Sequence, residues 1–293
     1  MSAEPTPDVR TVRLGLELRH VRLEQNLTLQ KAHKLLRRSI SSISRIEKGQ
    51  VRIPERDLPP ILDAYGITEP ARREALLALT RRNDAKDWWQ SYRDVLVVYP
   101  TFISMENEAT RIRAFECVFL PGLLQTPEYA WEIFTAGVPG RSALETKRLT
   151  DVRVKRQQIL GRTARPDVHV IVTESTLRQS VGGPEVMRRQ LQHLLTEIDG
   201  GRVGLQVLPF TAGAHPALGS FNILTVPALG GDIVHIDETN QSRFVDDSAA
   251  TRRYLDVYER LRAAALSEGD SRKRIEHLVF ESQSQAKGRP RRA

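Results

Sequence analysis

The stretch from Ser39 to Gly49 combines small hydroxyl groups with two cations at a spacing that suits contacts with nucleic acid. It reads Ser-Ile-Ser-Ser-Ile-Ser-Arg-Ile-Glu-Lys-Gly. On a helix, at about 100° per residue, Ile43 and Ile46 fall on one side. The opposite side carries the polar residues Ser41, Ser44, Arg45 and Lys48. Serine and arginine side chains can approach base edges closely, and a lysine can contact phosphates.

The two ends of this stretch carry signals for a short helix. The Ser39 hydroxyl can cap a helix that starts at the next residue, and Gly49 suits the left-handed position that ends one. Four serines give the stretch a low helix propensity, so packing of the isoleucines must hold it. Taken alone, the same pattern also fits an ordinary amphipathic surface helix.

Candidate acid–base or metal-binding residues lie in the second half of the sequence. They are His169, His215, His235, Asp237 and Glu238. On a strand, His235 and Asp237 would share a face. However, the sequence has no H-E-x-x-H, G-x-S-x-G or phosphate-loop motif. We therefore expect no enzymatic activity, no metal site and no cofactor.

A loop rich in small residues runs from Phe210 to Gly219 and reads Phe-Thr-Ala-Gly-Ala-His-Pro-Ala-Leu-Gly. Such a segment can pack against a ligand or a partner protein, or it can form a tight connection between strands. Its candidate binding residues are Phe210, His215 and Leu218. Both interpretations stay open at this point.

Charge is distributed unevenly along the 293 residues, a length that suggests about two domains. Residues 1–86 carry 17 Lys+Arg and 11 Asp+Glu, residues 87–270 carry 20 and 23, and residues 271–293 carry 7 and 2. The net charge is +8. Basic ends around a slightly acidic middle favour a nucleic-acid-binding module joined to a domain with another role.

The single cysteine, Cys117, excludes an internal disulfide and an all-cysteine zinc site. It stands in an apolar run, which favours a small buried residue over a nucleophile. No apolar run approaches the roughly 20 residues that a membrane-spanning helix needs, and the N-terminus has no signal-peptide core. These features predict a cytoplasmic protein.

Apolar spacing predicts five short helices in residues 13–86, after a disordered segment at residues 1–12. We expect the helices near residues 13–25, 28–36, 39–49, 54–66 and 69–86. The adjacent tryptophans Trp88 and Trp89 then indicate a linker helix over residues 87–100, with at least one ring packed between domains or subunits.

The five helices predicted in about 75 residues resemble the Cro/C1-type (Xre-like) helix-turn-helix domain. The local match is Leu27-Thr28, followed by Ser44-Arg45-Ile46-Glu47-Lys48-Gly49. The resemblance implies a structural ion pair between Arg22 and Glu47. It implies base contacts from Ile40, Ser41, Ser44 and Arg45. It also implies phosphate contacts from Leu29, Gln30, Ser39 and Lys48.

Three residues depart from the pattern of that family. His33 replaces a small residue, Arg37 replaces the turn glycine, and Leu29 replaces a frequent glutamine. A left-handed backbone at Arg37 would cost about 1 kcal/mol. The bulk of His33 is expected to crowd the contact between the second and third helices.

Residues 101–282 are expected to form an α+β domain, with a sheet of at least four strands flanked by helices. Strands are predicted at residues 111–116, 168–172, 203–208, 221–226 and 233–236. Helix starts are indicated at Pro127, at the capping box Ser142-x-x-Glu145, and at Pro184, with further helices from about residue 249 and over 271–281. Residues 283–293 are expected to form a basic tail.

Four phrases of this second domain carry a more specific resemblance: FLPGLLQTPEYA, VGGPEVMRRQLQHLL, LQVLPFTAGAHPALGSF and YERLRAAALS. In this order they resemble the C-terminal domain of a group of actinobacterial Xre-type regulators. The resemblance implies an antitoxin-like regulator of a kind commonly encoded beside a small partner protein.

Three hypotheses follow for the function. The first is a homodimeric, sequence-specific transcription regulator whose C-terminal domain mediates dimerisation and binds a small protein or a ligand, because paired half-sites let two modules add their affinities. The second is an antitoxin-like protein that mainly binds the product of a neighbouring gene and uses DNA binding for autoregulation. The third, least favoured, is an enzyme with a DNA-binding appendage.

Overall fold

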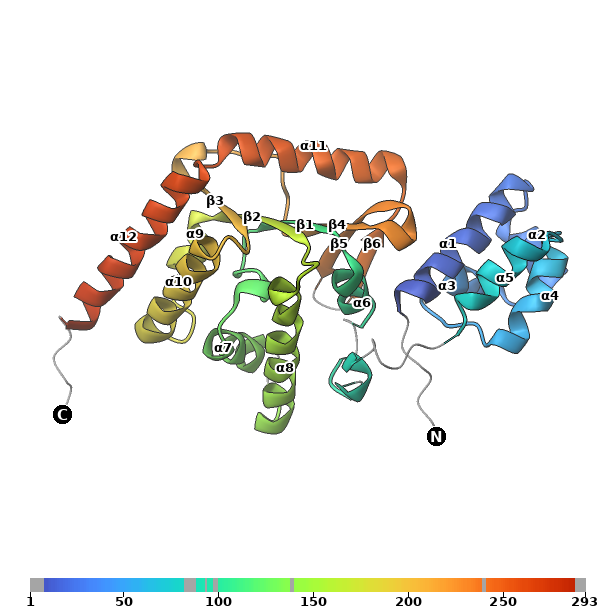
Figure 1. Cartoon of the computed structure of the whole chain (residues 1–293), viewed down its shortest axis with the longest axis horizontal. Helices are drawn as coiled ribbons and strands as arrows, with labels where there is room; N and C mark the ends of the chain where they lie inside the picture. Colours follow the sequence, from blue (N-terminus) through green and yellow to red (C-terminus); the bar gives the residue numbers. More distant parts are fainter. Residues whose placement is uncertain are drawn as a thin grey trace. The chain divides into compact units, whose positions relative to one another are not determined.

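The structure, a computed structural model, describes residues 8–81, 88–92, 94–96, 100–137, 140–238 and 241–287. By its internal contacts the chain divides into two compact units (Figure 1). The N-terminal unit comprises residues 1–108 and 227–231, and the second unit comprises residues 109–226 and 232–293. None of the described helices is both long enough and apolar enough to cross a lipid bilayer.

The N-terminal unit begins with five α-helices: α1 (Val9–Glu24), α2 (Leu29–Leu36), α3 (Ile40–Glu47), α4 (Leu58–Ala64) and α5 (Pro70–Ala78). Their apolar sides meet in one core, which includes Leu18, Ile43, Leu58 and Leu62. Burying a leucine or isoleucine contributes about 1.5–3 kcal/mol. A serine inside a helix costs roughly 0.5 kcal/mol relative to alanine, so packing outweighs the weak propensity of α3.

The first helix begins earlier than the sequence predicted. Asp8 is its N-cap and accepts a hydrogen bond from the Thr11 N–H at 2.9 Å. The Val9 N–H donates to the Ser104 hydroxyl at 2.8 Å. The prediction of disorder is therefore wrong for residues 8–12, because an aspartate cap organises them. Residues 1–7 lie outside the described part of the chain.

The expected linker helix is not continuous. A 3-10 helix, η2, covers Trp88–Tyr92, residues 94 and 95 form a turn, and α6 begins at Pro100 (Pro100–Glu108). Proline lacks the N–H needed to continue a helix and restricts the residue before it. Trp89 is buried, and its ring meets that of Trp88 edge to face at 5.9 Å.

A six-stranded mixed sheet forms the centre of the second unit, which confirms the predicted α+β fold. Its strands are β1 (Arg111–Glu116), β2 (Asp167–Thr173), β3 (Gly204–Leu208), β4 (Phe221–Val226), β5 (Gly231–Glu238) and β6 (Gln241–Val245), in the spatial order β3-β2-β1-β4-β5-β6. Strands β1, β2 and β3 are parallel, whereas β4 is antiparallel to β1 and β6 to β5. The sequence did not predict β6, whose residues are largely polar.

Helices cover both faces of this sheet (Figure 1). They are α7 (Pro127–Gly137), α8 (Ala143–Arg156), α9 (Glu174–Arg178), α10 (Pro184–Asp199), α11 (Ser248–Ala264) and α12 (Glu268–Lys287). On the α11 face, Tyr258 and Leu261 pack on Phe115 and Ile223 of the sheet. The predicted capping box is present, because Ser142 and Glu145 exchange hydrogen bonds at the start of α8.

The last helix is longer than the sequence predicted at both ends. It begins at Glu268 and ends at Lys287, so its final turn covers the first part of the expected basic tail. The helix therefore extends into residues 283–287 of the expected basic tail. Residues 288–293 lie outside the described part of the chain.

Candidate nucleic-acid interface

Local hydrogen bonds define both ends of α3. The Ser39 hydroxyl accepts the Ser42 N–H at 3.1 Å. At the other end, Gly49 has a φ of 63°, its N–H donates to the Ile46 carbonyl at 2.9 Å, and the Gln50 N–H donates to the Arg45 carbonyl at 2.8 Å. These bonds form a Schellman motif, which satisfies the last carbonyls of the helix.

Two glycines bring α1 close to the end of α3. A Cβ atom on Gly15 would overlap the Ile46 carbonyl oxygen and lie 2.9 Å from that of Glu47. A Cβ atom on Gly49 would lie 2.5 Å from the Cα of Val12. The position of α3 therefore depends on Gly15, whose role the sequence did not indicate, because its contact partners are 31 or more residues away along the chain.

The Arg22 and Glu47 side chains, which the resemblance paired, meet in the core of this unit. Arg22 Nε lies 2.6 Å from Glu47 Oε1, and Arg22 Nη2 lies 2.8 Å from Oε2. Arg22 is only 7% exposed and Glu47 only 4%. Arg22 Nη1 also donates to the Leu27 carbonyl at 2.6 Å, which ties the turn after α1 to the same group. The hydrogen bond with Glu47 raises the pKa of Arg22.

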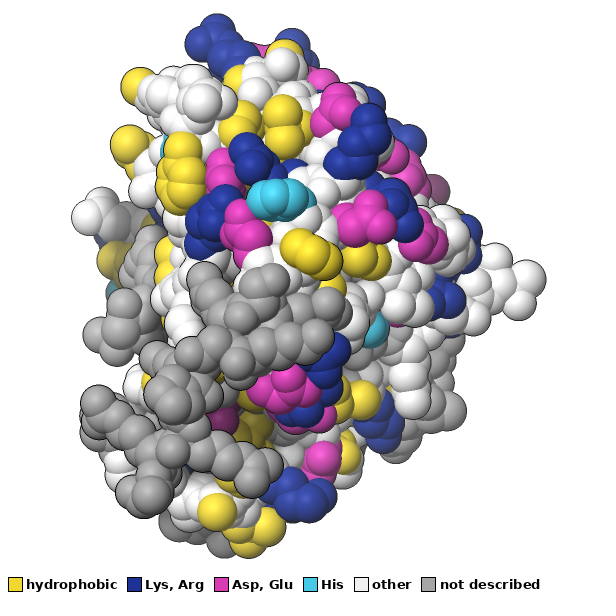
Figure 2. Space-filling view, turned by 90° about the vertical axis from the view of Figure 1, so that its left-hand side faces the viewer, with side chains coloured by type: hydrophobic (Ala, Val, Ile, Leu, Met, Phe, Trp, Pro, Cys, Tyr) yellow, Lys and Arg dark blue, Asp and Glu magenta, His cyan; other side chains and the backbone are white. Residues whose placement is uncertain are grey.

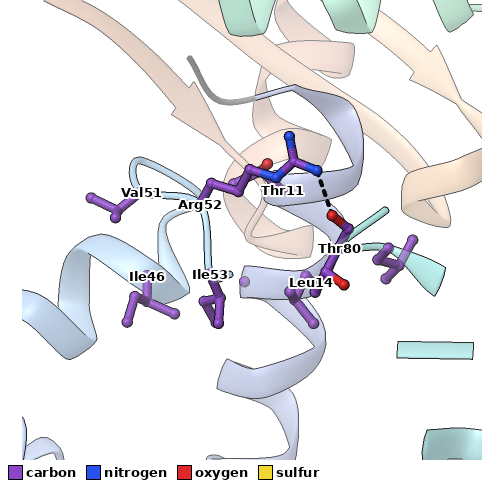
Figure 3. A pocket seen from close by; sticks show the side chains of 9 residues that line it. Thr11, Leu14, Ile46, Val51, Arg52, Ile53 and Thr80 are labelled. Atoms are coloured by element: carbon purple, nitrogen blue, oxygen red, sulfur yellow. Dashed lines mark hydrogen bonds between the residues drawn. The ribbon is translucent and has the colours of Figure 1, made fainter. Parts of the chain in front are cut away.

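The loop after α3 is tied to the end of the five-helix region. Arg52 extends from this loop and donates to the Thr80 carbonyl (Figure 3). Leu14, Ile46 and Ile53 line the shallow pocket beside this bond. Because the pocket leaves no room for a water-sized molecule, we interpret it as a packing gap and not as a ligand site.

The residues that the resemblance assigned to DNA lie mainly on the outer side of this arrangement. Ile40 is 41% exposed. Ser44 is half-buried, and the others are exposed: Gln30, Ser39, Ser41, Arg45 and Lys48. Leu29, by contrast, packs on the core, so a phosphate contact there can come only from its backbone.

Most of the cations around α2 and α3 have no acidic neighbour in the described part of the chain, whereas Arg38 pairs with Asp57 at 3.5 Å. No carboxylate lies within 4.0 Å of five of them, namely Lys31, Lys34, Arg37, Arg45 and Lys48. Several basic side chains of the second unit are paired with acids, as in Arg272–Asp199 and Arg178–Glu281. Figure 2, viewed from the α12 side, shows basic and acidic groups next to one another. Uncompensated positive charge around α2 and α3 attracts phosphate.

The turn between α2 and α3 adopts the conformation that usually requires glycine. Arg37 has φ 52° and ψ 33°, in the left-handed region. His33 Nδ1 donates to the Arg38 carbonyl at 2.7 Å, and the imidazole is exposed. Ala32 is the fully buried residue of α2. The expected crowding by His33 is therefore wrong, because its ring points away from the core and closes the turn.

The histidines considered for chemistry occupy separate packing sites in the second unit. His169 Nδ1 lies 2.5 Å from the Tyr258 hydroxyl, and the His215 ring meets Phe115 edge to face at 5.5 Å. Burial lowers the pKa of His235 to about 3, and its ring packs on Phe244. Across the described ranges, no three His, Cys, Asp or Glu side chains are grouped to hold a metal ion.

Two residues of the second unit differ from what the sequence suggested. Cys117 is half-buried, not fully buried, and its N–H donates to the Ser220 hydroxyl at 3.1 Å. Glu116, at the end of β1, was not singled out. Burial raises its pKa to about 7, although a hydrogen bond with Ser220 and the nearby cations of α8 oppose this shift.

The loop after β3 exposes the apolar residues proposed for binding. Phe210 is 63% exposed, and Leu218 is fully exposed. The Phe210 N–H donates to Glu174 at 3.3 Å, which anchors the start of this loop to α9. His215 lies inward, against the sheet, and does not join the other two on the surface.

Comparisons with known families divide the chain in a similar way. A model described as a helix-turn-helix domain matches residues 13–76, which include α2, α3 and the turn between them. A model described as a domain of unknown function (DUF5753) matches residues 99–277, more than half of the chain. No curated protein and no solved structure matches the chain. The protein therefore belongs to the DUF5753 family and carries a helix-turn-helix domain ahead of that region.

Proposed function

We propose that the protein is a sequence-specific, DNA-binding transcription regulator of the Cro/C1 type that inserts α3 into the DNA major groove. One observation carries this proposal: the outer face of α3 presents Ser41, Arg45 and Lys48 without an acidic partner among the described residues. Its inner face is held by Ile43, Ile46 and Glu47. A helix with its side chains is about 10–12 Å across, which fits a major groove about 12 Å wide.

The residues on this face divide into two roles. Arg45, exposed in the last turn of the helix, suits the bidentate pattern of acceptors on guanine. Ser41 and Ser44 supply hydroxyl groups of either polarity to neighbouring base edges. Lys48, at the end of α3, and Gln30, in the first turn of α2, suit phosphate contacts that set the register.

The proposed active form is a homodimer. One module of this size offers few base contacts, and two modules on half-sites about one helical turn apart combine their affinities. We assign dimerisation to the second unit and place the protein in the cytoplasm, where it has access to DNA. Sedimentation of the full-length protein, free and with DNA, tests this part, and a monomer under both conditions would contradict it.

The second unit is proposed to receive a signal from a small protein or a ligand. The exposure of Phe210 and Leu218, which stand in the same loop, supports an apolar docking contact, because exposed apolar patches are typical of interaction sites. If the main partner is the product of a neighbouring gene, DNA binding becomes autoregulation of an antitoxin-like pair. Co-purification that is lost in a Phe210→Ser, Leu218→Ser variant would favour that alternative.

No catalytic step is assigned to the second unit. Its histidines pack in separate places, and the sequence has no catalytic motif. A metal or cofactor found by elemental analysis and native mass spectrometry of the full-length protein would contradict this assignment.

The main test is selection of bound duplexes from a random DNA pool, followed by binding measurements with Arg45→Ala. If Arg45 reads a base, the loss is about 1–3 kcal/mol, and discrimination at one base pair is relaxed. Lys273→Ala is the control, because it removes one exposed positive charge from α12. Equal affinity and specificity of Arg45→Ala and wild type would refute the role of Arg45. Failure of the wild-type protein to select any sequence would refute specific DNA binding.

A further inference from the structure

Left-handed backbone positions in the N-terminal unit are occupied by residues that tolerate them, with one exception. Asn26 has a φ of 54°, Gly49 of 63° and Gly66 of 66°. Glycine and asparagine adopt this conformation readily. Arg37, with a φ of 52°, is the exception among the described residues, and strain of this kind is often kept where it serves function.

The fold makes no visible use of the Arg37 side chain. It is exposed, and it forms no hydrogen bond or ion pair in the described part of the chain. The backbone around it is held by its neighbours instead. His33 donates to the Arg38 carbonyl at 2.7 Å, and the Arg38 guanidinium lies 3.5 Å from Asp57. Glycine at this position would therefore keep the turn and remove the strain.

The location of Arg37 indicates what the side chain can bind. It lies two residues before Ser39, the cap of the helix assigned to the major groove. Lys34 of α2 and Arg45 of α3 also have no acidic partner within the described ranges. A guanidinium beside a groove-bound helix is close to the phosphates that border the groove, and its planar set of donors matches phosphate oxygens.

We propose that Arg37 binds a phosphate of the DNA backbone beside the start of α3, and that this contact offsets the strain of its left-handed backbone. This inference rests on the proposed DNA-binding function. It assigns a DNA contact to a position that is glycine in the family pattern and therefore has no side chain there to make one. Because phosphates are common to all sequences, Arg37 contributes to affinity and register and not to base discrimination.

The test compares Arg37→Gly, Arg37→Ala and Arg37→Lys with wild type and with the charge-matched control Lys273→Ala. Binding of full-length protein to a fluorescein-labelled duplex of mixed sequence is measured by anisotropy over a range of salt concentrations. Loss of one phosphate contact is expected to weaken binding roughly two- to tenfold and to reduce the salt slope by about 0.9. Arg37→Lys should keep most of the slope, and Lys273→Ala should keep all of it.

Arg37→Gly separates binding from folding. Glycine relieves the backbone strain of the folded state, but it also adds conformational freedom to the unfolded chain. The net gain in stability should slow hydrogen exchange in α2 and α3 by roughly two- to fivefold. A variant that is more protected yet binds DNA more weakly shows a direct contact. An unchanged salt slope in Arg37→Gly and Arg37→Ala, with wild type still binding, would overturn the role of Arg37 alone. If wild type does not bind the duplex, both proposals fail.

Discussion

Removal of Arg22 tests how the helix-turn-helix unit holds its recognition helix. Arg22→Met keeps an unbranched side chain of similar reach and removes the guanidinium that meets Glu47 at 2.6 and 2.8 Å. Glu47 is 4% exposed, so its carboxylate is left without its charged partner and nearly without water. The Leu27 carbonyl loses a donor in the same step.

The expected cost is large for a unit of this size. Removing one partner of a buried ion pair typically costs about 3–5 kcal/mol, because the remaining charge is buried without compensation. Whole domains are stable by only about 5–15 kcal/mol. Arg22→Met is therefore expected to remove a large share of the stability of the N-terminal unit and to weaken DNA binding indirectly.

The variant should also become sensitive to pH in a defined direction. A buried carboxylate without a partner favours its neutral form. At low pH it takes up a proton and the penalty falls, whereas at pH 8 it must be buried as an anion. The stability deficit of Arg22→Met relative to wild type should thus be smaller at pH 5 than at pH 8.

Hydrogen exchange of the full-length protein, followed by mass spectrometry of α1 and α3 peptides, measures this deficit locally. The double variant Arg22→Met, Glu47→Leu should be less destabilised than Arg22→Met alone, because no charge remains buried. Arg81→Met, which disrupts an exposed pair with Glu74, should leave exchange unchanged. Equal deficits in the single and double variants, independent of pH, would refute the reasoning.

Two further predictions concern close packing and a half-buried acid. Gly15→Ala should destabilise the N-terminal unit by about 1–3 kcal/mol, because overlap with the Ile46 carbonyl outweighs the roughly 0.5–1 kcal/mol that alanine gains in a helix. Hydrogen exchange of the amides in α1 and α3 measures this change, and slower exchange in the variant would contradict the prediction. Glu116, whose folded pKa is raised to about 7, contributes stability in its neutral form that is lost as the pH rises through 7. Glu116→Gln should therefore be more stable than wild type at pH 8, by up to roughly 3 kcal/mol, with little difference at pH 4; thermal unfolding at both values measures this, and a gain that is equal at both would count against it.

Local signals in the sequence were sufficient for most of the elements. Ser39 and Gly49 marked the ends of the recognition helix, and Ser142 with Glu145 marked the start of α8. Caps work through hydrogen bonds between residues at most five positions apart, so they can be found without a fold. Strands with continuous apolar residues were found because that pattern is also local in the sequence. The polar strand β6 was missed because it is a strand only through its pairing with β5.

What the sequence by itself determined is therefore most of the helices and strands, the basic N-terminal region and the face of α3 that carries Ser41 and Arg45. Only the tertiary structure decided which residues hold that face in place. Helix packing brings Gly15 into contact with the end of α3. The turn between α2 and α3 sets the outward direction of the His33 ring and the left-handed backbone of Arg37. A side chain's surroundings follow from packing, and packing joins residues that the order of the sequence keeps apart.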